Sequence, residues 1–228
     1  IATSSDKATI SLLESGATWR YLDDGSDQGT AWREPGFDDE AWASGAAQLG
    51  YGDGDEVTTI GFGDDSENVF PTTYFRTSFE LQDPSVLESL TLDLLYDDGA
   101  AVYINGVEAV RLNLGEDATF DAFATTFRSN PAERQFERIA LPNSILELLV
   151  AGENTIAVEV HQASAGSSDV SLDMSLLSTL EVEATPGLQL NPGINRLMAE
   201  AFDEEGQLIE TETLDIWFDT GTAQEISG

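Results

Sequence analysis

The fold is decided by the stretch AVYINGVEAV at residues 101–110, in which two apolar, alternating runs flank an Asn-Gly pair. Asn105 and Gly106 are residue types that accept the two positive φ values of a two-residue hairpin turn. Alternation with a period of two places one set of side chains on a buried sheet face. The stretch therefore predicts a tight antiparallel β-hairpin.

The same period of two recurs along the chain. Residues 73–79, 90–94 and 155–160 alternate in this way, and we predict that they form half-buried antiparallel strands. Residues 169–177 alternate again and predict the closing strand of a domain. Clusters rich in Asp and Gly separate these stretches and are typical of turns. We therefore expect an all-β fold, an antiparallel jelly-roll β-sandwich.

Helix-like spacing is confined to residues 141–150, where Pro142 opens and Gly152 closes a run of good helix formers. This spacing predicts one or two helical turns. The segment at residues 50–71 has little periodicity and many glycines, and long loops of this kind tend to be functional or to hold ions.

A chain of 228 residues can bury one core of roughly 150 residues plus a smaller unit. We predict an N-terminal strand or extension at 1–14, a jelly roll at 15–178 and a C-terminal β segment at 179–228. Two strands, 194–202 and 208–218, make up most of that last segment. An isolated hairpin is marginal in water, so the segment packs on the first domain, belongs to a longer chain or pairs with a neighbouring molecule.

The chain carries 43 acidic against 9 basic residues, a formal net charge of −34. Phosphate binding needs a basic face, so nucleic acid is excluded as a partner, and an anionic membrane surface is disfavoured for the same reason. No apolar run reaches the length of a membrane span, so we expect no membrane insertion. Because self-repulsion of this size is relieved by salt or by divalent cations, we expect bound Ca²⁺ or a salty, marine-like medium.

Cysteine is absent, so the sequence offers no disulfide, thiolate metal site or thiol nucleophile. The single histidine, His161, rules out multi-histidine zinc sites, and no Gly-x-Ser-x-Gly nucleophile elbow is present. Close carboxylate pairs are certain among so many acids and carry no catalytic information. We therefore predict no catalytic residues and no enzyme activity, and a role as the accessory domain of a secreted hydrolase stays open.

Three stretches carry a family resemblance. The run 19–42, with WRYLDDGS at its start and GFDDEAW at its end, resembles the opening of galactose-binding-domain-like modules of secreted bacterial proteins. Residues 96–106 look like their central hairpin, and residues 152–161 like their penultimate strand. The resemblance covers roughly residues 15–177. The tail is similar to the last two strands of bacterial immunoglobulin-like repeats.

The resemblance implies a jelly roll of eight to nine strands, often with a structural calcium, whose ligands are held by loops at one end or on the concave face. Such modules accompany many carbohydrate-active enzymes outside the cell, while other relatives only connect domains. The resemblance thus implies an extracellular protein and a glycan as partner, without specifying the sugar.

Calcium takes six to eight oxygen ligands, commonly from clustered carboxylates in glycine-rich turns. Three acidic loops have this composition, and we predict that at least one of them binds Ca²⁺. Their candidate ligands are Asp23, Asp24 and Asp27; Asp53, Asp55 and Glu56; and Asp64, Asp65 and Glu67.

Sugar recognition combines an aromatic ring that stacks on the sugar with planar polar groups that satisfy its hydroxyls. The predicted ligand-binding residues are Tyr51, Phe62, Tyr74, Arg76 and His161. Tyr51 and Phe62 lie in the glycine-rich segment, where a large ring has no obvious core to join. We interpret the tryptophans at 19, 42 and 217 as core packing residues.

Two functions remain open at this point. The first is a calcium-stabilised, non-catalytic carbohydrate-binding module that tethers a larger protein or a cell to a glycan. The alternative is a structural or adhesive subunit of an extracellular filament or matrix, which packs as a linker or self-associates through its sheet edges. In that alternative, residues 7–13 or the C-terminal hairpin complete the sheet of a neighbour.

Overall fold

The computed structural model describes residues 6–182, 193–202, 207–219 and 222–225. The chain divides into two compact units, one formed by Ser5–Val182 and the other by Ile1–Ser4 with Glu183–Gly228. The division follows the end of a long strand that continues a few residues beyond the predicted boundary at 178.

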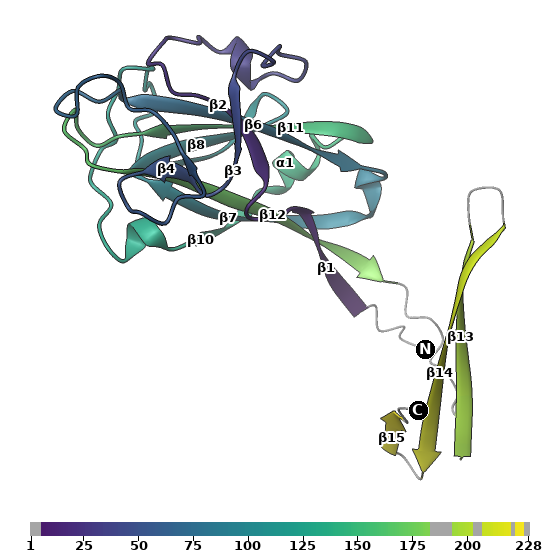
Figure 1. Cartoon of the computed structure of the whole chain (residues 1–228). Helices are drawn as coiled ribbons and strands as arrows, with labels where there is room; N and C mark the ends of the chain where they lie inside the picture. Colours follow the sequence, from purple (N-terminus) through teal and green to yellow (C-terminus); the bar gives the residue numbers. More distant parts are fainter. Residues whose placement is uncertain (1–5, 183–192, 203–206, 220–221, 226–228) are drawn as a thin grey trace. The chain divides into compact units, whose positions relative to one another are not determined.

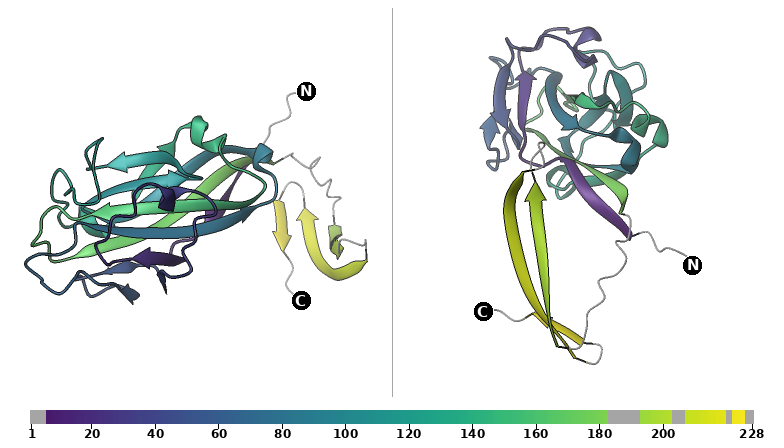
Figure 2. Two further views of the ribbon diagram at one scale, coloured as in Figure 1. Left: turned by 90° about the horizontal axis from the view of Figure 1, so that it is seen from above. Right: turned by 90° about the vertical axis from the view of Figure 1, so that its right-hand side faces the viewer.

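The first unit is a sandwich of two mostly antiparallel sheets, seen as two layers of ribbon in Figure 1 and Figure 2. One sheet has the order β10-β7-β12-β4-β5, with β1 also pairing with β12. Its strands are β1 (Asp6–Leu13), β4 (Leu49–Tyr51), β5 (Thr58–Thr59), β7 (Leu87–Asp97), β10 (Glu137–Leu141) and β12 (Val170–Val182). The fold is thus the predicted all-β sandwich.

The second sheet has the order β3-β2-β6-β11-β8-β9. Its strands are β2 (Thr18–Leu22), β3 (Ala43–Ala46), β6 (Thr72–Leu81), β8 (Gly99–Ile104), β9 (Val107–Leu112) and β11 (Gly152–His161). One helical turn, α1 (Asn143–Leu146), precedes β11 and confirms the short helix predicted there.

The predicted hairpin is confirmed as β8–β9. Asn105 has φ +48° and Gly106 has φ +85°, as a tight turn of this kind requires. The alternating stretches at 73–79, 90–94 and 155–160 all lie within strands, and the predicted closing strand is part of β12. Local pattern therefore determined these elements.

The main core lies between the two sheets. Leu92 and Leu172 from one sheet and Phe75 and Val158 from the other are fully buried in one cluster. Removal of such apolar surface from water is the main stabilising contribution to the fold.

The expectation that the strands are half-buried is wrong for the centre of the second sheet. Every residue of β8 is buried, and so are the last eight residues of β11. A second apolar cluster lies on the outer face, built from Trp32, Tyr74 and Tyr103 with Trp42, Ala101, Leu114 and Ala157. Aromatic and small side chains at the outward positions make this possible, because they leave an apolar face that loops can cover.

Two other expectations need correction. Residues 50–71 are not structureless, because β4 and β5 pair in parallel there. The second concerns the alternative in which residues 7–13 complete the sheet of a neighbour: the predicted N-terminal strand is present as β1, and it pairs antiparallel with β12 of the same chain. One edge of this strand is therefore already occupied within the first unit.

The second unit is a three-stranded antiparallel sheet of β13 (Gly193–Phe202), β14 (Leu208–Asp219) and β15 (Thr222–Glu225). The two predicted strands are confirmed, while β15 is too short and polar to show an alternating pattern. Residues 203–206, between the two predicted strands, and the side chain of Trp217 lie outside the described residues. Among the described residues, no helix is both long and apolar enough to cross a membrane.

Close contact between β4 and β12 depends on glycine. A Cβ atom at Gly50 would collide with the backbone carbonyl of Val170, which a flexible side chain cannot relieve. We predict that Gly50→Ala lowers the free energy of unfolding by about 1–3 kcal/mol, the usual range for overpacking. Gly115→Ala is the matched control, because its Cβ would meet no atom within 4 Å, and we expect a change below about 0.5 kcal/mol. Urea unfolding followed by tryptophan fluorescence measures both, and equal stabilities would contradict the prediction.

Candidate cation site and ligand pockets

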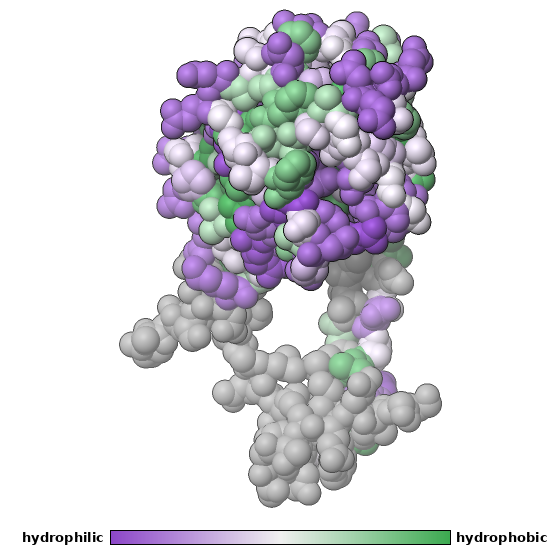
Figure 3. Space-filling view, turned by 90° about the vertical axis from the view of Figure 1, so that its left-hand side faces the viewer, coloured by the Kyte–Doolittle hydropathy of each residue, from purple (hydrophilic) through white to green (hydrophobic). Residues whose placement is uncertain are grey.

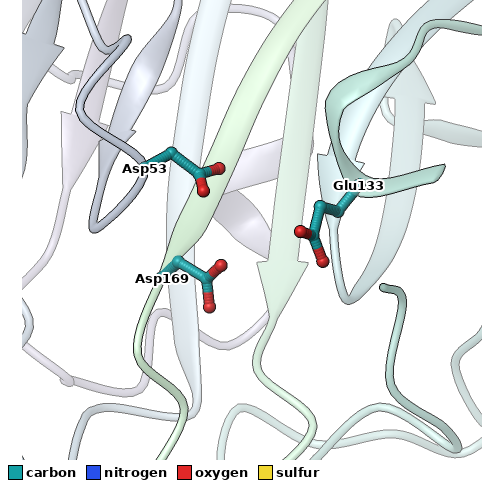
Figure 4. Close-up of side chains that lie close together, drawn as sticks. All are labelled: Asp53, Glu133 and Asp169. Atoms are coloured by element: carbon teal, nitrogen blue, oxygen red, sulfur yellow. The ribbon is translucent and has the colours of Figure 1, made fainter. Parts of the chain in front are cut away.

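Three carboxylates from distant parts of the chain meet at one end of the sandwich (Figure 4). Asp53 follows β4, Glu133 lies in the 3-10 turn Ala132–Arg134 before β10, and Asp169 immediately precedes β12. One oxygen from each lies within 4.8 Å of the others. Two oxygens on opposite sides of a calcium ion are separated by about 4.8 Å, twice the usual Ca–O distance, so these three can share one ion.

A glycine, Gly52, also allows the loop after β4 to come close to the start of β12. Gly52, next to Asp53, has φ +101°, and a Cβ there would lie 2.8 Å from the Cα of Asp169. Only a residue without a side chain fits both the positive φ and this contact. The loop after β4 can therefore bring its carboxylate against the start of β12.

The site places carboxylates close together in a poorly solvated region. Burial, and then the nearby Asp98, Asp169 and Glu133, raise the pKa of Asp97 to about 9. Burial is also the main cause of the raised pKa of Asp169 and of Glu133, followed in Glu133 by the charge of Asp169 and in Asp169 by that of Asp53. Among the described residues, Oδ1 of Asp97 is buried without a hydrogen-bond partner. Ionising all of these carboxyl groups together is therefore unfavourable at this point.

Protein groups neutralise part of this charge. Arg134 forms an ion pair with Asp53. Asp98 accepts hydrogen bonds from the backbone N–H groups of Arg128 at 2.6 Å and Ala163 at 2.8 Å. No ion pair within the described part of the chain involves Asp97, Glu133 or Asp169 themselves. The all-oxygen donor set fits a hard divalent cation such as Ca²⁺.

The acidic loops predicted from the sequence divide into two groups. Asp53 belongs to the cluster, whereas its neighbour Asp55 lies beside Arg134 at 4.0 Å, and Glu56 accepts from two backbone N–H groups of its own turn. The other predicted carboxylates join no set of three potential ligands among the described residues; they are Asp23, Asp24, Asp27, Asp64, Asp65 and Glu67. Most of them accept hydrogen bonds from nearby backbone N–H groups and so shape their loops.

A pocket of about 510 Å³ opens on the outer face of the second sheet. Tyr74 of β6, Glu159 of β11 and Arg33 contribute to its wall, together with Asp27, Gly29, Thr30, Ala118, Thr119, Phe120 and Asp121. Strand alternation places Glu159 on this face, opposite the core residue Val158. The pocket therefore has a rigid floor and a rim of loops.

Glu159 is the buried acid of this pocket. Burial opposes its ionisation, yet His161, the Tyr103 hydroxyl and the charge of Arg33 hold the pKa of Glu159 below its ordinary value. The Tyr103 hydroxyl donates to it at 2.7 Å, and an Arg33 nitrogen lies 3.5 Å away. The carboxylate is thus ionised and available as an acceptor.

Arg33 supplies donors to the same pocket. Its guanidinium stacks over the ring of Tyr103, with 4.2 Å from Cζ to the ring centroid, and over Trp32 at 5.5 Å. Its Nε is buried and has no hydrogen-bond partner among the residues that the structure describes. A buried donor without a partner costs free energy that a polar ligand can recover. Donor, acceptor and aromatic rings are therefore held together in one place.

The structure separates the five predicted ligand-binding residues. Tyr74 lines the outer-face pocket, and His161 is fully buried near it, with Nε2 3.7 Å from Glu159 and Nδ1 2.8 Å from the Ala122 carbonyl oxygen. Arg76 is buried, forms an ion pair with Asp39 and lines another pocket.

Tyr51 and Phe62 lie at the loop end, with ring centroids 5.0 Å apart, beside a third pocket of about 310 Å³. The expectation that these rings have no core to join is wrong. Tyr51 is buried in the main core, Phe62 packs against that core, and the Gln162 amide donates to the Tyr51 hydroxyl at 2.7 Å. The glycine-rich loop thus folds back onto the sandwich.

Sequence reasoning missed both cation-cluster partners of Asp53, and it missed three exposed phenylalanines. Phe123, Phe127 and Phe136 are 39%, 71% and 45% exposed and come from the segment around the β9–β10 connection. Figure 3 shows apolar surface among the acidic and polar side chains on the side of the molecule at the left of Figure 1. The richness of residues 120–136 in phenylalanine was the sequence signal that could have predicted this exposed apolar surface.

Comparison with known proteins gives only distant likenesses. No family model matches this chain, and no curated protein matches it. Similar solved structures include β-glucuronidase 2 of Bacteroides uniformis bound to cyclophellitol-6-carboxylate aziridine (TM-score 0.47, 15% identity, 97% of this chain and 27% of that one). A β-glucuronidase of Ruminococcus gnavus has a TM-score of 0.46 and 12% identity, and the match covers 93% of this chain and 38% of that one. A β-glucuronidase from glycoside hydrolase family 2 has a TM-score of 0.47 and 14% identity, and the match covers 99% of this chain and 26% of that one. The chain spans between about a quarter and two fifths of these enzymes.

We predict that Ca²⁺ stabilises the protein and that Asp169→Asn removes most of this effect. Calcium at a hundredfold excess over Kd adds roughly 2.7 kcal/mol to the free energy of unfolding, and loss of one ligand lowers affinity by at least about tenfold. Thermal melts with EDTA and with CaCl₂, together with calorimetric titration, measure the effect. Asp64→Asn is the control, because it removes one acid from a loop outside the cluster. Identical melts with and without calcium would contradict the prediction.

The cluster also predicts a pH dependence in the absence of divalent cations. Because the pKa of Asp97 is about 9 in the folded protein and near 3.9 when unfolded, the folded state binds more protons between these values. The contribution of Asp97 to the free energy of unfolding is therefore largest at low pH and is lost as the pH rises toward 9. Asp97→Asn should therefore flatten the fall in stability between pH 6 and 9. Urea unfolding in EDTA at constant ionic strength tests this, and parallel curves for both proteins would count against it.

Proposed function

We propose that the first unit is a non-catalytic carbohydrate-binding module whose sugar site is the outer-face pocket of the second sheet. The observation that carries the proposal is the pairing of a donor, Arg33, with a buried ionised acceptor, Glu159, beside the ring of Tyr74. Sugar hydroxyls both donate and accept, so a site for them needs both kinds of group held rigidly.

The size and polarity of the pocket support this function. Its volume of about 510 Å³ falls within the range of small-molecule sites, roughly 300–1,000 Å³. Acidic and hydroxyl side chains at the rim, such as Asp27, Thr30 and Asp121, add further hydrogen-bonding groups around the opening. Phe120 contributes apolar surface on which a sugar ring can stack.

In this proposal the cation has a structural role. A calcium ion held by Asp53, Glu133 and Asp169 joins three segments that have no covalent connection nearby, and it compensates their mutual repulsion. Modules outside the cell bind calcium with dissociation constants of roughly 10⁻⁴–10⁻³ M, a range that a partly buried three-carboxylate site can reach. An extracellular location, with the module tethering a larger protein or a cell to a glycan, completes the proposal.

The test is retention on a glycan. We predict that Arg33→Ala weakens binding by at least about tenfold, because it removes a charge-assisted donor and leaves Glu159 less well compensated. Affinity electrophoresis through gels with neutral or acidic polysaccharides, in the presence of calcium, measures the change in mobility.

Arg138→Gln is the matched control, because it also removes one arginine from an ion pair, on strand β10 of the other sheet. Circular dichroism and thermal melts establish that both variants are folded. If no polysaccharide retards the wild-type protein, or if both variants behave alike, this proposal fails.

A further inference from the structure

Almost every cation of the described chain is compensated by a carboxylate. Within the ranges that the structure describes, the ion pairs are Lys7–Glu88, Arg33–Glu159, Arg76–Asp39, Arg111–Glu108, Arg128–Glu137, Arg134–Asp53, Arg138–Asp93 and Arg196–Asp215. Arg20 is the exception, since no carboxylate of the described residues forms an ion pair with it. The protein has 43 acidic residues, so an arginine without a carboxylate partner among the described residues is unusual here.

Arg20 lies on β2 directly opposite Arg76 of β6. Two like charges in this register repel each other, a cost that many sheets avoid. Arg76 is already engaged, because its Nε donates to Asp39 at 2.8 Å and its Nη1 to the carbonyl of Trp32. Arg20 itself donates a long hydrogen bond of 3.4 Å from Nη1 to the carbonyl oxygen of Trp42. Most of the donors of Arg20 are therefore available to a ligand.

A pocket of about 460 Å³ lies beside these two arginines. Its wall contains five hydroxyl side chains, Thr18, Ser44, Thr77, Ser78 and Thr155. Tyr74 and Arg76 are two positions apart on β6, so they face the same side of the sheet. This second pocket and the proposed sugar pocket therefore open on one face of the same sheet.

We propose that the pocket beside Arg20 binds the carboxylate of an acidic sugar residue, with Arg20 as its ion-pair partner. The inference rests on the proposed glycan binding and specifies its substrate class as polysaccharides that contain uronic acids. A guanidinium presents two parallel N–H groups that match the two oxygens of a carboxylate. The surrounding hydroxyls can exchange hydrogen bonds with the hydroxyls of the sugar ring.

The two acids of this pocket sharpen the selectivity. Asp39 is bound by Arg76, and Glu153 accepts a hydrogen bond from Ser78 at 3.3 Å. Both repel a second negative group inside the pocket, so the pocket suits one carboxylate, placed next to Arg20, while the neighbouring sugars of a chain lie outside it. Because the net charge of −34 repels any anionic glycan at long range, binding requires salt, which shortens the Debye length to about 4 Å or less at 0.5–1 M.

The experiment compares glycans that differ only in charge. Short oligomers of galacturonate and of mannuronate, and the methyl ester of each, are titrated calorimetrically in 0.5 M NaCl into the whole chain. We expect the wild type to bind at least one acid oligomer about tenfold more tightly than its ester, the usual value of a charge-assisted hydrogen bond. Arg20→Gln should remove this preference and leave the affinity for the ester unchanged.

Two further variants make the result specific. Arg20→Lys keeps the charge but loses the two-pronged geometry, so an intermediate preference is expected. Arg138→Gln should behave as the wild type, and thermal melts identify any variant that fails to fold.

The outcomes separate the two proposals. Equal affinity of the wild type for acid and ester, or an equal loss of both in Arg20→Gln, overturns the role of Arg20 and leaves the sugar pocket standing. Failure of the wild type to bind any of these oligomers or any neutral polysaccharide overturns both. Retention of neutral polysaccharide alone overturns only the acidic specificity.

Discussion

Burial of strand β11 on both of its faces is the constraint on which the rest of the structure depends. Val158 packs between the sheets, while its neighbours Ala157 and Glu159 face an aromatic layer on the other side. A strand with this arrangement cannot shift by one residue, because a shift would exchange the core and outer faces. The outer face is therefore a fixed platform, and the proposed sugar pocket and the pocket beside Arg20 are both built on it.

The same platform explains how a charged group can be buried in so acidic a protein. Glu159 is tolerated because the Tyr103 hydroxyl donates to it and because Arg33 and Arg111 lie near it. Arginine suits this environment, since its planar guanidinium stacks on aromatic rings as it pairs with the acid. Arg128 also stacks on an aromatic ring while it pairs with an acid, with its guanidinium over Tyr96 and an ion pair to Glu137.

At the loop end the balance is reversed, since acids there outnumber the cations that approach them. Gly50 and Gly52 let the loop after β4 lie against β12, and this contact brings Asp53 to Asp169. Close backbone packing therefore brings like charges together, and burial, followed by the charges of neighbouring acids such as Asp169, raises the pKa of Asp97 to about 9. A cation at this point would offset that repulsion and fasten the loops that frame the end of the sandwich.

The sequence by itself determined the elements that depend on local conformation. The Asn-Gly turn at 105–106 fixes the β8–β9 hairpin, because the positive φ values belong to those residue types wherever they occur. Alternation fixed the strands β6, β7 and β11, and the acidic, glycine-rich composition of the loop after β4 marked Asp53 as a candidate ligand.

Tertiary structure alone decided which residues meet. Glu133 and Asp169 carry no local signal, and they join Asp53 only because the sheets bring three loops to one end. The burial of Tyr51 likewise depends on how strands pair and how loops fold over them, and so does the lack of a carboxylate partner for Arg20 within the described part of the chain. Local pattern encodes backbone conformation and the side on which a residue lies, whereas contact between distant side chains is set by the packing of the sandwich as a whole.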